Sequence, residues 1–125
     1  MTTGVDKLIK TQTMKEFALL FRQPGFDYSN LSAAEMAALS KKWSDWAGAI
    51  AKEGRLVDNG VRLDVTGKVL KAGGLVTDGP FVEIREILGS FVVIKADSLD
   101  DAITVAHGCP VLDRGGSVEI RPVFN

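Results

Sequence analysis

The sequence predicts an α+β domain in which two helices cover one face of a four-stranded antiparallel sheet. Residues 17–21 and 91–94 are apolar at every position, which is typical of strands covered on both faces. Two other segments, which begin after Ser32 and Ser98, repeat apolar residues at helical intervals. Residues 56–63 and 117–123 are less apolar or alternate strictly, as expected at sheet edges. The elements therefore follow one another in the order β-α-β-β-α-β.

The first strand is predicted over residues 14–22, before the break at Gln23-Pro24-Gly25. Ser32 and Glu35 then have the spacing of a capping box, which marks a helix start. Helical spacing connects five apolar residues: Met36, Leu39, Trp43, Ala47 and Ile50. The first helix is therefore expected over residues 33–53, ending at Gly54.

The second strand, residues 56–63, is interrupted by Asp58-Asn59-Gly60 and is expected at an edge of the sheet. Residues 64–77 carry two glycine-containing turns around short apolar pairs, the pattern of a hairpin insertion. The Asp78-Gly79-Pro80-Phe81 run that follows has strong turn chemistry, because Gly permits positive φ and Pro restricts the residue before it. Residues 82–88 fit a helical turn and a short strand equally well.

Residues 91–94 form the predicted third strand. The second helix starts at Ser98 with an acidic first turn and stops at Gly108 and Pro110. Its expected buried stripe consists of Leu99, Ala102, Ile103 and Ala106. Residues 117–123 form the last strand, whose Pro122 is tolerated only at an edge or a strand end.

With the two most apolar strands at the centre, the predicted sheet order is 4-1-3-2, the ferredoxin-like arrangement. Two helices can cover only one face of this sheet, yet the central strands are apolar on the other face as well. A second copy is the simplest cover for that face. We therefore expect a homodimer packed sheet to sheet.

Length and composition place the chain among ordinary globular proteins. Its 125 residues suit a single domain over residues 14–125, preceded by a mobile or weakly docked extension over residues 1–13. The 15 basic and 16 acidic residues nearly cancel, which disfavours a nucleic-acid-binding surface. No apolar run reaches the ~20 residues that span a bilayer, and the start has no apolar core of a signal peptide.

Cofactor and metal chemistry find little support in the residue pattern. Cys109 is the only cysteine, so it forms no intramolecular disulfide and suits a reducing cytoplasm. No Cys and His cluster has metal-ligand spacing, and the paired glycines lack the strand-to-helix context of a phosphate loop. His107 lies two residues before Cys109, but no orienting acid is evident for a thiol-imidazole pair. We expect neither cofactor nor metal.

Several motifs in order resemble the YCII-related family in its DGPF-domain branch, within the dimeric α/β-barrel superfamily. They are LVTDGPFVE at residues 75–83, LGSF at 88–91, GCP at 108–110 and GGSVEIRP at 115–122. The resemblance covers nearly the whole chain except the N-terminal extension. It implies the ferredoxin-like dimer, with a cleft in each subunit near Asp78. The His and Asp pair of the family's shorter branch is not carried over, because His107 does not match its position.

The candidate catalytic residue is Asp78, which would act as a general acid or base in a water-poor cleft. An acceptor that shapes the turn is its more common role. Predicted substrate contacts are Phe81 in the same motif, followed by Glu83 and Arg85. The alternative role for these two charged residues is a solvated or intramolecular ion pair. Trp46, at the margin of the apolar stripe, is the better aromatic wall for a planar ligand, whereas the centrally placed Trp43 is assigned to the core. Two arginines at strand ends are candidate anion contacts: Arg22 and Arg62.

Two functions follow from these expectations. The first is a cytoplasmic, cofactor-free, small-molecule-binding homodimer with acid or base chemistry, lyase-like or isomerase-like, on a small polar or aromatic compound. The resemblance supports this class, since a few relatives are similar to enzymes acting on hydroxylated aromatics. The second is a non-catalytic ligand-sensing or protein-interaction module, linked to transcription because related domains accompany bacterial sigma factors. The lack of a second proton carrier beside Asp78 favours the second.

Overall fold

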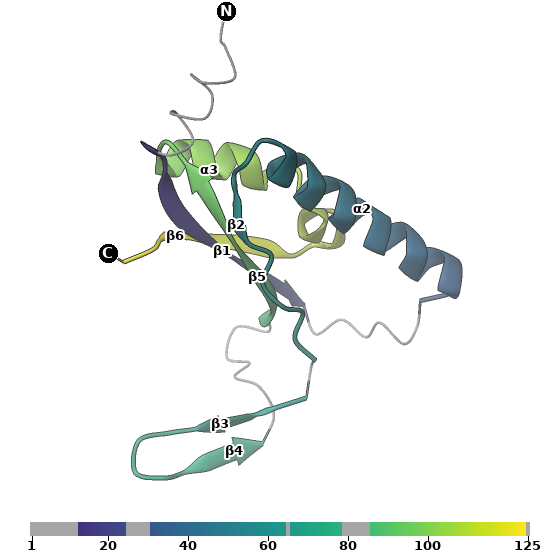
Figure 1. Ribbon diagram of the computed structural model, residues 1–125. Coiled ribbons are helices and arrows are strands. Elements are labelled where there is room, and N and C mark those ends of the chain that lie inside the picture. Colours follow the sequence, from purple (N-terminus) through teal and green to yellow (C-terminus); the bar gives the residue numbers. More distant parts are fainter. Residues whose placement is uncertain (1–12, 25–30, 65, 79–85, 125) are drawn as a thin grey trace, which may run out of the picture.

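The computed structural model describes residues 13–24, 31–64, 66–78 and 86–124. Its elements follow the order β1 (Lys15–Pro24), α2 (Ala33–Lys52), β2 (Leu56–Asp58), β3 (Lys68–Leu70), β4 (Val76–Asp78), β5 (Glu86–Ala96), α3 (Leu99–Ala106), the 3-10 helix η2 (Pro110–Arg114) and β6 (Ser117–Pro122). The antiparallel main sheet has the order β2-β5-β1-β6, and β3 and β4 form a separate hairpin (Figure 1). The predicted ferredoxin-like α+β fold and sheet order are confirmed.

The core lies between the sheet and the two helices, which cover the same face (Figure 1). Alternate side chains of β1 and β5 point into it, as the two-residue period of a strand requires. Cross-strand pairing aligns Phe17 with Ile94 and Leu19 with Val92. The buried strand residues are Phe17, Leu19, Phe21, Val92, Ile94 and Ala96. This apolar layer fixes the register of the two central strands, since a one-residue slip would turn it to the opposite face.

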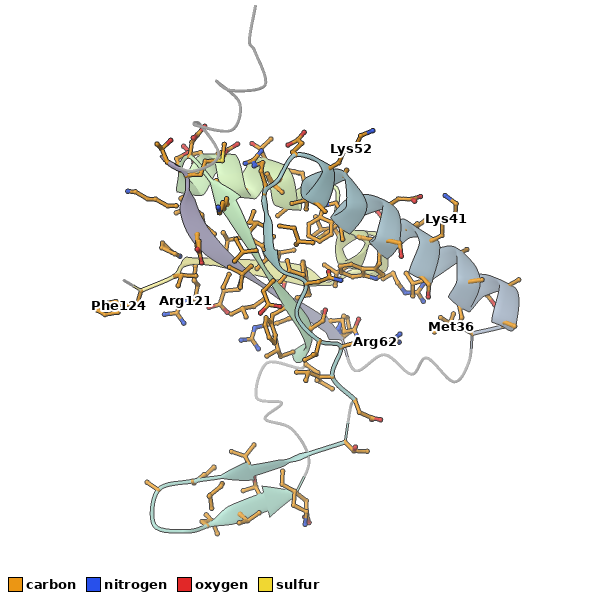
Figure 2. The ribbon with its side chains drawn as sticks, viewed as in Figure 1. Met36, Lys41, Lys52, Arg62, Arg121 and Phe124 are labelled. Atoms are coloured by element: carbon orange, nitrogen blue, oxygen red, sulfur yellow. The ribbon has the colours of Figure 1, made fainter. Side chains whose placement is uncertain are left out.

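Helix α2 begins at the predicted capping box. The Ser32 hydroxyl accepts a hydrogen bond from the Glu35 amide, and the Ser32 amide donates to the Glu35 carboxylate, both at 3.1 Å. At the other end Gly54 has a φ of 73°, a left-handed conformation that suits glycine. Lys41 and Lys52 extend from the side of α2 that faces away from the sheet (Figure 2). The sequence therefore predicted both ends of α2 closely.

The second strand is shorter than predicted. Regular pairing covers only Leu56 and Asp58, followed by a single bridge between Arg62 and Ser90. The Asp58 carboxylate accepts a hydrogen bond of 2.7 Å from the Gly60 amide, and Gly60 has a φ of 65°. This turn takes the chain out of the strand conformation. In the ambiguous segment 82–88, residues 86–88 belong to β5, and residues 82–85 lie outside the described residues.

Helix α3 begins after Ser98 as predicted, but its expected buried stripe is half wrong. Ala102 and Ala106 are buried, whereas Leu99 and Ile103 are 47% and 40% exposed. The helix is only eight residues long and packs on the sheet through its alanines, so its buried face is narrow. The chain then forms η2, which the sequence pattern did not indicate.

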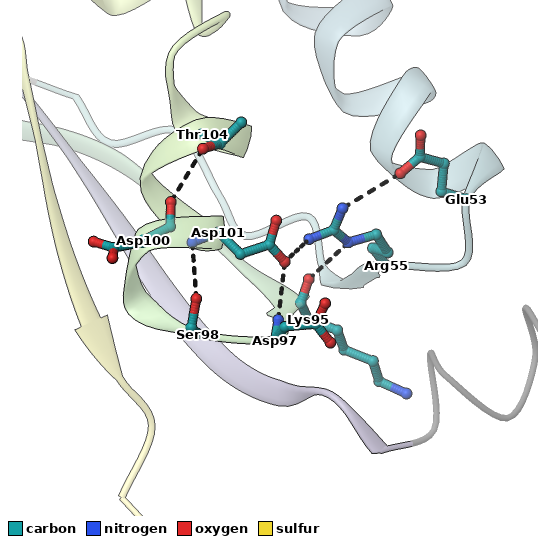
Figure 3. Close-up of polar contacts among 8 residues, drawn as sticks. All are labelled: Glu53, Arg55, Lys95, Asp97, Ser98, Asp100, Asp101 and Thr104. Carbon is teal, nitrogen blue, oxygen red and sulfur yellow. Dashed lines mark hydrogen bonds and ion pairs between the residues drawn. The ribbon is translucent and has the colours of Figure 1, made fainter.

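A polar network ties β2 to β5 and α3 (Figure 3). The Arg55 guanidinium donates through Nε to the Lys95 carbonyl at 3.0 Å and through Nη2 to Asp101 Oδ2 at 2.7 Å. The same carboxylate oxygen accepts from the Asp97 amide at 2.9 Å. Because the Arg55 side chain is largely buried, these charge-assisted bonds hold the short edge strand in place.

The other face of the main sheet has no helix over it in the described residues (Figure 1). Ala18 and Leu20 of β1 and Val93 of β5 point to this face, and all three are half-buried. Beside them on β6, Glu119 pairs with Arg22 at 3.4 Å. The sheet-to-sheet homodimer stays a prediction for this face.

Residues 66–78, the arm, carry the predicted hairpin and project away from the sheet and helices (Figure 1). Pairing joins Lys68 to Asp78, Val69 to Thr77 and Leu70 to Val76. Gly73 and Gly74 both have left-handed φ values in the connecting turn. Among the described residues, none of the helices has the length and apolar content needed to cross a membrane.

Candidate functional site

A cavity of about 350 Å³ lies between α2, the segment 59–63 and the end of the sheet where β1 finishes and β5 begins. This volume falls within the range of small-molecule clefts. Helix α2 lines it with Leu39, Ser40, Trp43, Ser44, Trp46 and Ala47, and the sheet and η2 with Phe21, Gln23, Gly89, Ser90, Phe91, Val92 and Val111. The remaining wall consists of residues 59–63.

Aromatic side chains form a fixed cluster along the helix side of the cavity. Trp43 and Trp46 are three residues apart and therefore lie on neighbouring parts of the α2 surface. Both meet Phe21 edge to face, with ring centroids 5.0 and 5.6 Å apart, and they meet each other at 5.9 Å. The Trp46 indole N–H also donates to the Val105 carbonyl at 3.1 Å, which locks its ring against α3. The cluster is a preformed aromatic wall.

The opposite wall, residues 59–63, is held close to β5. The Leu63 amide donates to the Gly89 carbonyl at 2.7 Å, next to the bridge between Arg62 and Ser90. A Cβ atom on Gly60 would overlap the carbonyl oxygen of Phe91, so only glycine allows this close approach. The cavity is therefore framed by backbone contacts and not by side chains alone.

The polar groups of the cavity are few and mostly uncharged. Hydroxyl and amide side chains come from Gln23, Ser40, Ser44, Asn59 and Ser90. Among the described lining residues, Arg62 is the only one with a formal charge. Figure 2 shows Arg62 at the lower edge of the main body, toward the arm. Such a surface suits a compact, largely apolar ligand that carries hydrogen-bonding or anionic groups.

The described residues of the lining include no carboxylate, imidazole or thiol that could transfer a proton. The structure also gathers no three His, Cys, Asp or Glu residues into a metal-binding group within its described part. The groups that the described lining does offer are ring surfaces, hydroxyls, amides and one guanidinium, which can bind and orient a ligand.

Two of the five predicted site residues, Trp46 and Asp78, belong to the described part of the chain, and they lie in different places. Trp46 lines the cavity, and so does Trp43, which its central place in the apolar stripe assigns to the core. Asp78 lies on the arm, where its side chain is 96% exposed and pairs with Lys68 at 3.3 Å. Phe81, Glu83 and Arg85 lie outside the described residues. Of the two arginines, Arg62 lines the cavity, whereas Arg22 pairs with Glu119.

Cys109 and His107 belong to the framework around α3. The Cys109 side chain is buried in the core, and burial raises the pKa of its thiol. His107 is the exposed C-terminal cap of α3. Between them, Gly108 lies so close to Trp46 that an added Cβ would come within 3.3 Å of the indole ring. A neutral, buried thiol is a packing group and not a nucleophile.

Sequence reasoning missed the wall formed by residues 59–63. Its signal is the Asp58-Asn59-Gly60 run, which the strand pattern identifies only as an interruption of an edge strand. A glycine inside a strand pattern also marks a place where another backbone approaches closely, and here that backbone belongs to Phe91.

The family model of the YCII-related domain matches residues 26–125 of the chain. A search of curated proteins found no matching relative.

Proposed function

Because the chain belongs to the YCII-related domain family, we propose that it is a homodimeric small-molecule-binding protein of the DGPF-domain branch. Its ligand is a compact compound with an apolar or aromatic body and a polar or anionic end. It binds between the aromatic cluster of α2 and the wall formed by residues 59–63. The buried state of the only cysteine suits a reducing cytoplasm.

The observation that carries this proposal is the combination of lining groups in one cavity. Trp43 and Trp46 offer ring surface that is already held in place, so a planar ligand meets little conformational cost on binding. Ser40 and Ser44 project from the same helix and can orient polar substituents.

Cofactor-free acid or base chemistry is the catalytic extension of this proposal, with Asp78 as the proton carrier and Phe81, Glu83 and Arg85 as ligand contacts. Its competitor is a ligand sensor without turnover, linked to transcriptional regulation. The absence of a proton carrier from the described lining supports the sensor. Replacing Asp78 by asparagine keeps the shape of the side chain, so turnover of an identified substrate that survives this change would eliminate the catalytic role.

The homodimer rests on the sheet face that lacks a helix. Ala18, Leu20 and Val93 form the apolar part of this face, and a second copy would bury it. Leu20→Asp would place a charge at the centre of the contact, so its expected result is a monomer in sedimentation-velocity runs. A dimer that is unaffected by Leu20→Asp would contradict sheet-to-sheet packing.

A thermal-shift screen with small aromatic and carboxylate-bearing compounds tests the binding function. A ligand at a hundred times its dissociation constant adds about 2.7 kcal/mol to the free energy of unfolding. Ser44→Phe fills the cavity from an exposed helix position, and Ala49→Phe is its control, because Ala49 is exposed on α2 outside the cavity. Hits should stabilise the wild type and Ala49→Phe but not Ser44→Phe. Equal stabilisation of all three proteins would contradict binding in this cavity.

A further inference from the structure

The arm exposes apolar side chains that nothing in the described part of the chain covers. Leu70 and Val76, opposite each other on β3 and β4, are 73% and 52% exposed. An isolated two-stranded hairpin is only marginally stable in water, so such a ribbon usually packs against another surface. The arm projects away from its own sheet and helices (Figure 1). No surface among the described residues of the same copy therefore covers this apolar pair.

One face of the arm combines these apolar residues with an ion pair. Residues directly opposite in an antiparallel pair, and residues two apart along a strand, share a face. The pairs Lys68 with Asp78 and Leu70 with Val76 therefore lie side by side on one surface. The distance of 3.3 Å between Lys68 Nζ and Asp78 Oδ1 agrees with this placement. We call these four residues the arm face.

The arm face is self-complementary when two arms are laid face to face, related by a two-fold axis that runs between them and parallel to their strands. In this arrangement β3 of each copy lies over β4 of the other. Lys68 of each copy then lies opposite Asp78 of the other, and Leu70 lies opposite Val76. A contact between identical subunits related by a two-fold axis requires this property. This charge complementarity favours a second copy of the chain as the partner.

We propose that the arms of two copies of this chain pack face to face, with Lys68 and Leu70 of one copy against Asp78 and Val76 of the other. The contact buries the exposed aliphatic pair and extends the ion pair across the interface. It is separate from the sheet face, and it does not depend on ligand binding. Asp78, the family-motif residue at the end of β4, is thereby an interface residue.

Charge reversal in two separate variants tests this contact. Lys68→Asp gives an arm face with two acids, and Asp78→Lys gives one with two amines. Each variant alone should self-associate roughly tenfold or more weakly than the wild type, because like charges then face each other. Mixed together, the two variants should form hetero-assemblies well above the statistical proportion. Native mass spectrometry of copies that carry different mass tags measures both effects.

The pair Lys41 and Asp45 provides the matched control, since it is an exposed ion pair on α2 with a distance of 2.8 Å. Lys41→Asp and Asp45→Lys should change neither self-association nor the mixing ratio. Circular dichroism confirms that the arm variants keep the fold, which is expected because all four arm-face residues are exposed. A statistical mixture of the arm variants overturns the proposal, and so does a wild type that stays monomeric at high micromolar concentration. Loss of association in Leu20→Asp with no effect of the arm variants leaves only the sheet-to-sheet dimer.

Discussion

Gly60→Ala tests how closely the wall of residues 59–63 lies against β5. Two costs are expected. An alanine at a φ of 65° loses about 1–2 kcal/mol in the left-handed region. Its Cβ would also overlap the Phe91 carbonyl oxygen, so the wall has to move, at a cost on the order of 1–3 kcal/mol. The free energy of unfolding should therefore fall by about 2–5 kcal/mol, a large part of the ~5–15 kcal/mol of a typical domain.

Gly115→Ala separates these two costs. Gly115 has a φ of 78°, but an added Cβ would meet no atom within 4 Å, so only the conformational cost applies. Equilibrium urea unfolding of both variants should show a clearly larger loss for Gly60→Ala. Ligands found by thermal shift should also bind Gly60→Ala more weakly, since the wall it displaces lines the cavity. Equal losses of stability in the two variants would refute the close approach of the wall to Phe91.

Three further predictions concern the framework of the fold. Arg55→Ala should lower the free energy of unfolding by about 2–3 kcal/mol, because it leaves the Asp101 carboxylate of α3 without its charge-assisted partner. Lys41→Ala, which removes an exposed ion pair, should change the free energy of unfolding by less than ~1 kcal/mol. Similar losses for the two variants in urea unfolding would contradict this prediction. Cys109 should react slowly with a thiol reagent at pH 8 until the protein unfolds, since burial raises its pKa, and rapid labelling of the native protein would show that the site opens. Hydrogen bonds from the Ser32 amide and hydroxyl lower the pKa of Glu35 below 4.5. The ionised Glu35 carboxylate therefore stabilises the fold above pH 4.5, and this stabilisation is lost as the pH falls through the folded-state pKa. Glu35→Gln should therefore flatten the acid side of the stability profile, and an unchanged profile would argue against the capping box.

The sheet and the first helix could be predicted because their signals are local and repeated. The capping box at Ser32 and Glu35 gives the start of α2, and the apolar run of residues 17–21 identifies a central strand. Prediction failed where a competing local interaction ended an element. The hydrogen bond from Gly60 to the Asp58 carboxylate ends β2 early, and no periodicity reveals it.

The cavity could be predicted only in part, because its lining comes from segments far apart in the chain. Phe21, Trp43 and Phe91 meet only after the sheet and α2 have packed. Local sequence instead drew attention to Asp78, where turn chemistry is dense. The structure places that residue on the arm, in an exposed ion pair. The glycine-containing turns of residues 64–77 therefore identified the projecting hairpin, and the aromatic spacing on α2 identified one wall of the cavity.

Intrinsic tryptophan fluorescence tests the central claim, a ligand cavity walled by α2, most directly. The chain has two tryptophans, and both line the cavity, so a bound ligand has to alter their environment. Titration with a compound that stabilises the protein should give a saturable fluorescence change in the wild type and in Ala49→Phe, and none in Ser44→Phe. A compound that binds all three proteins equally, with no change in tryptophan emission, would show that the ligand site lies elsewhere.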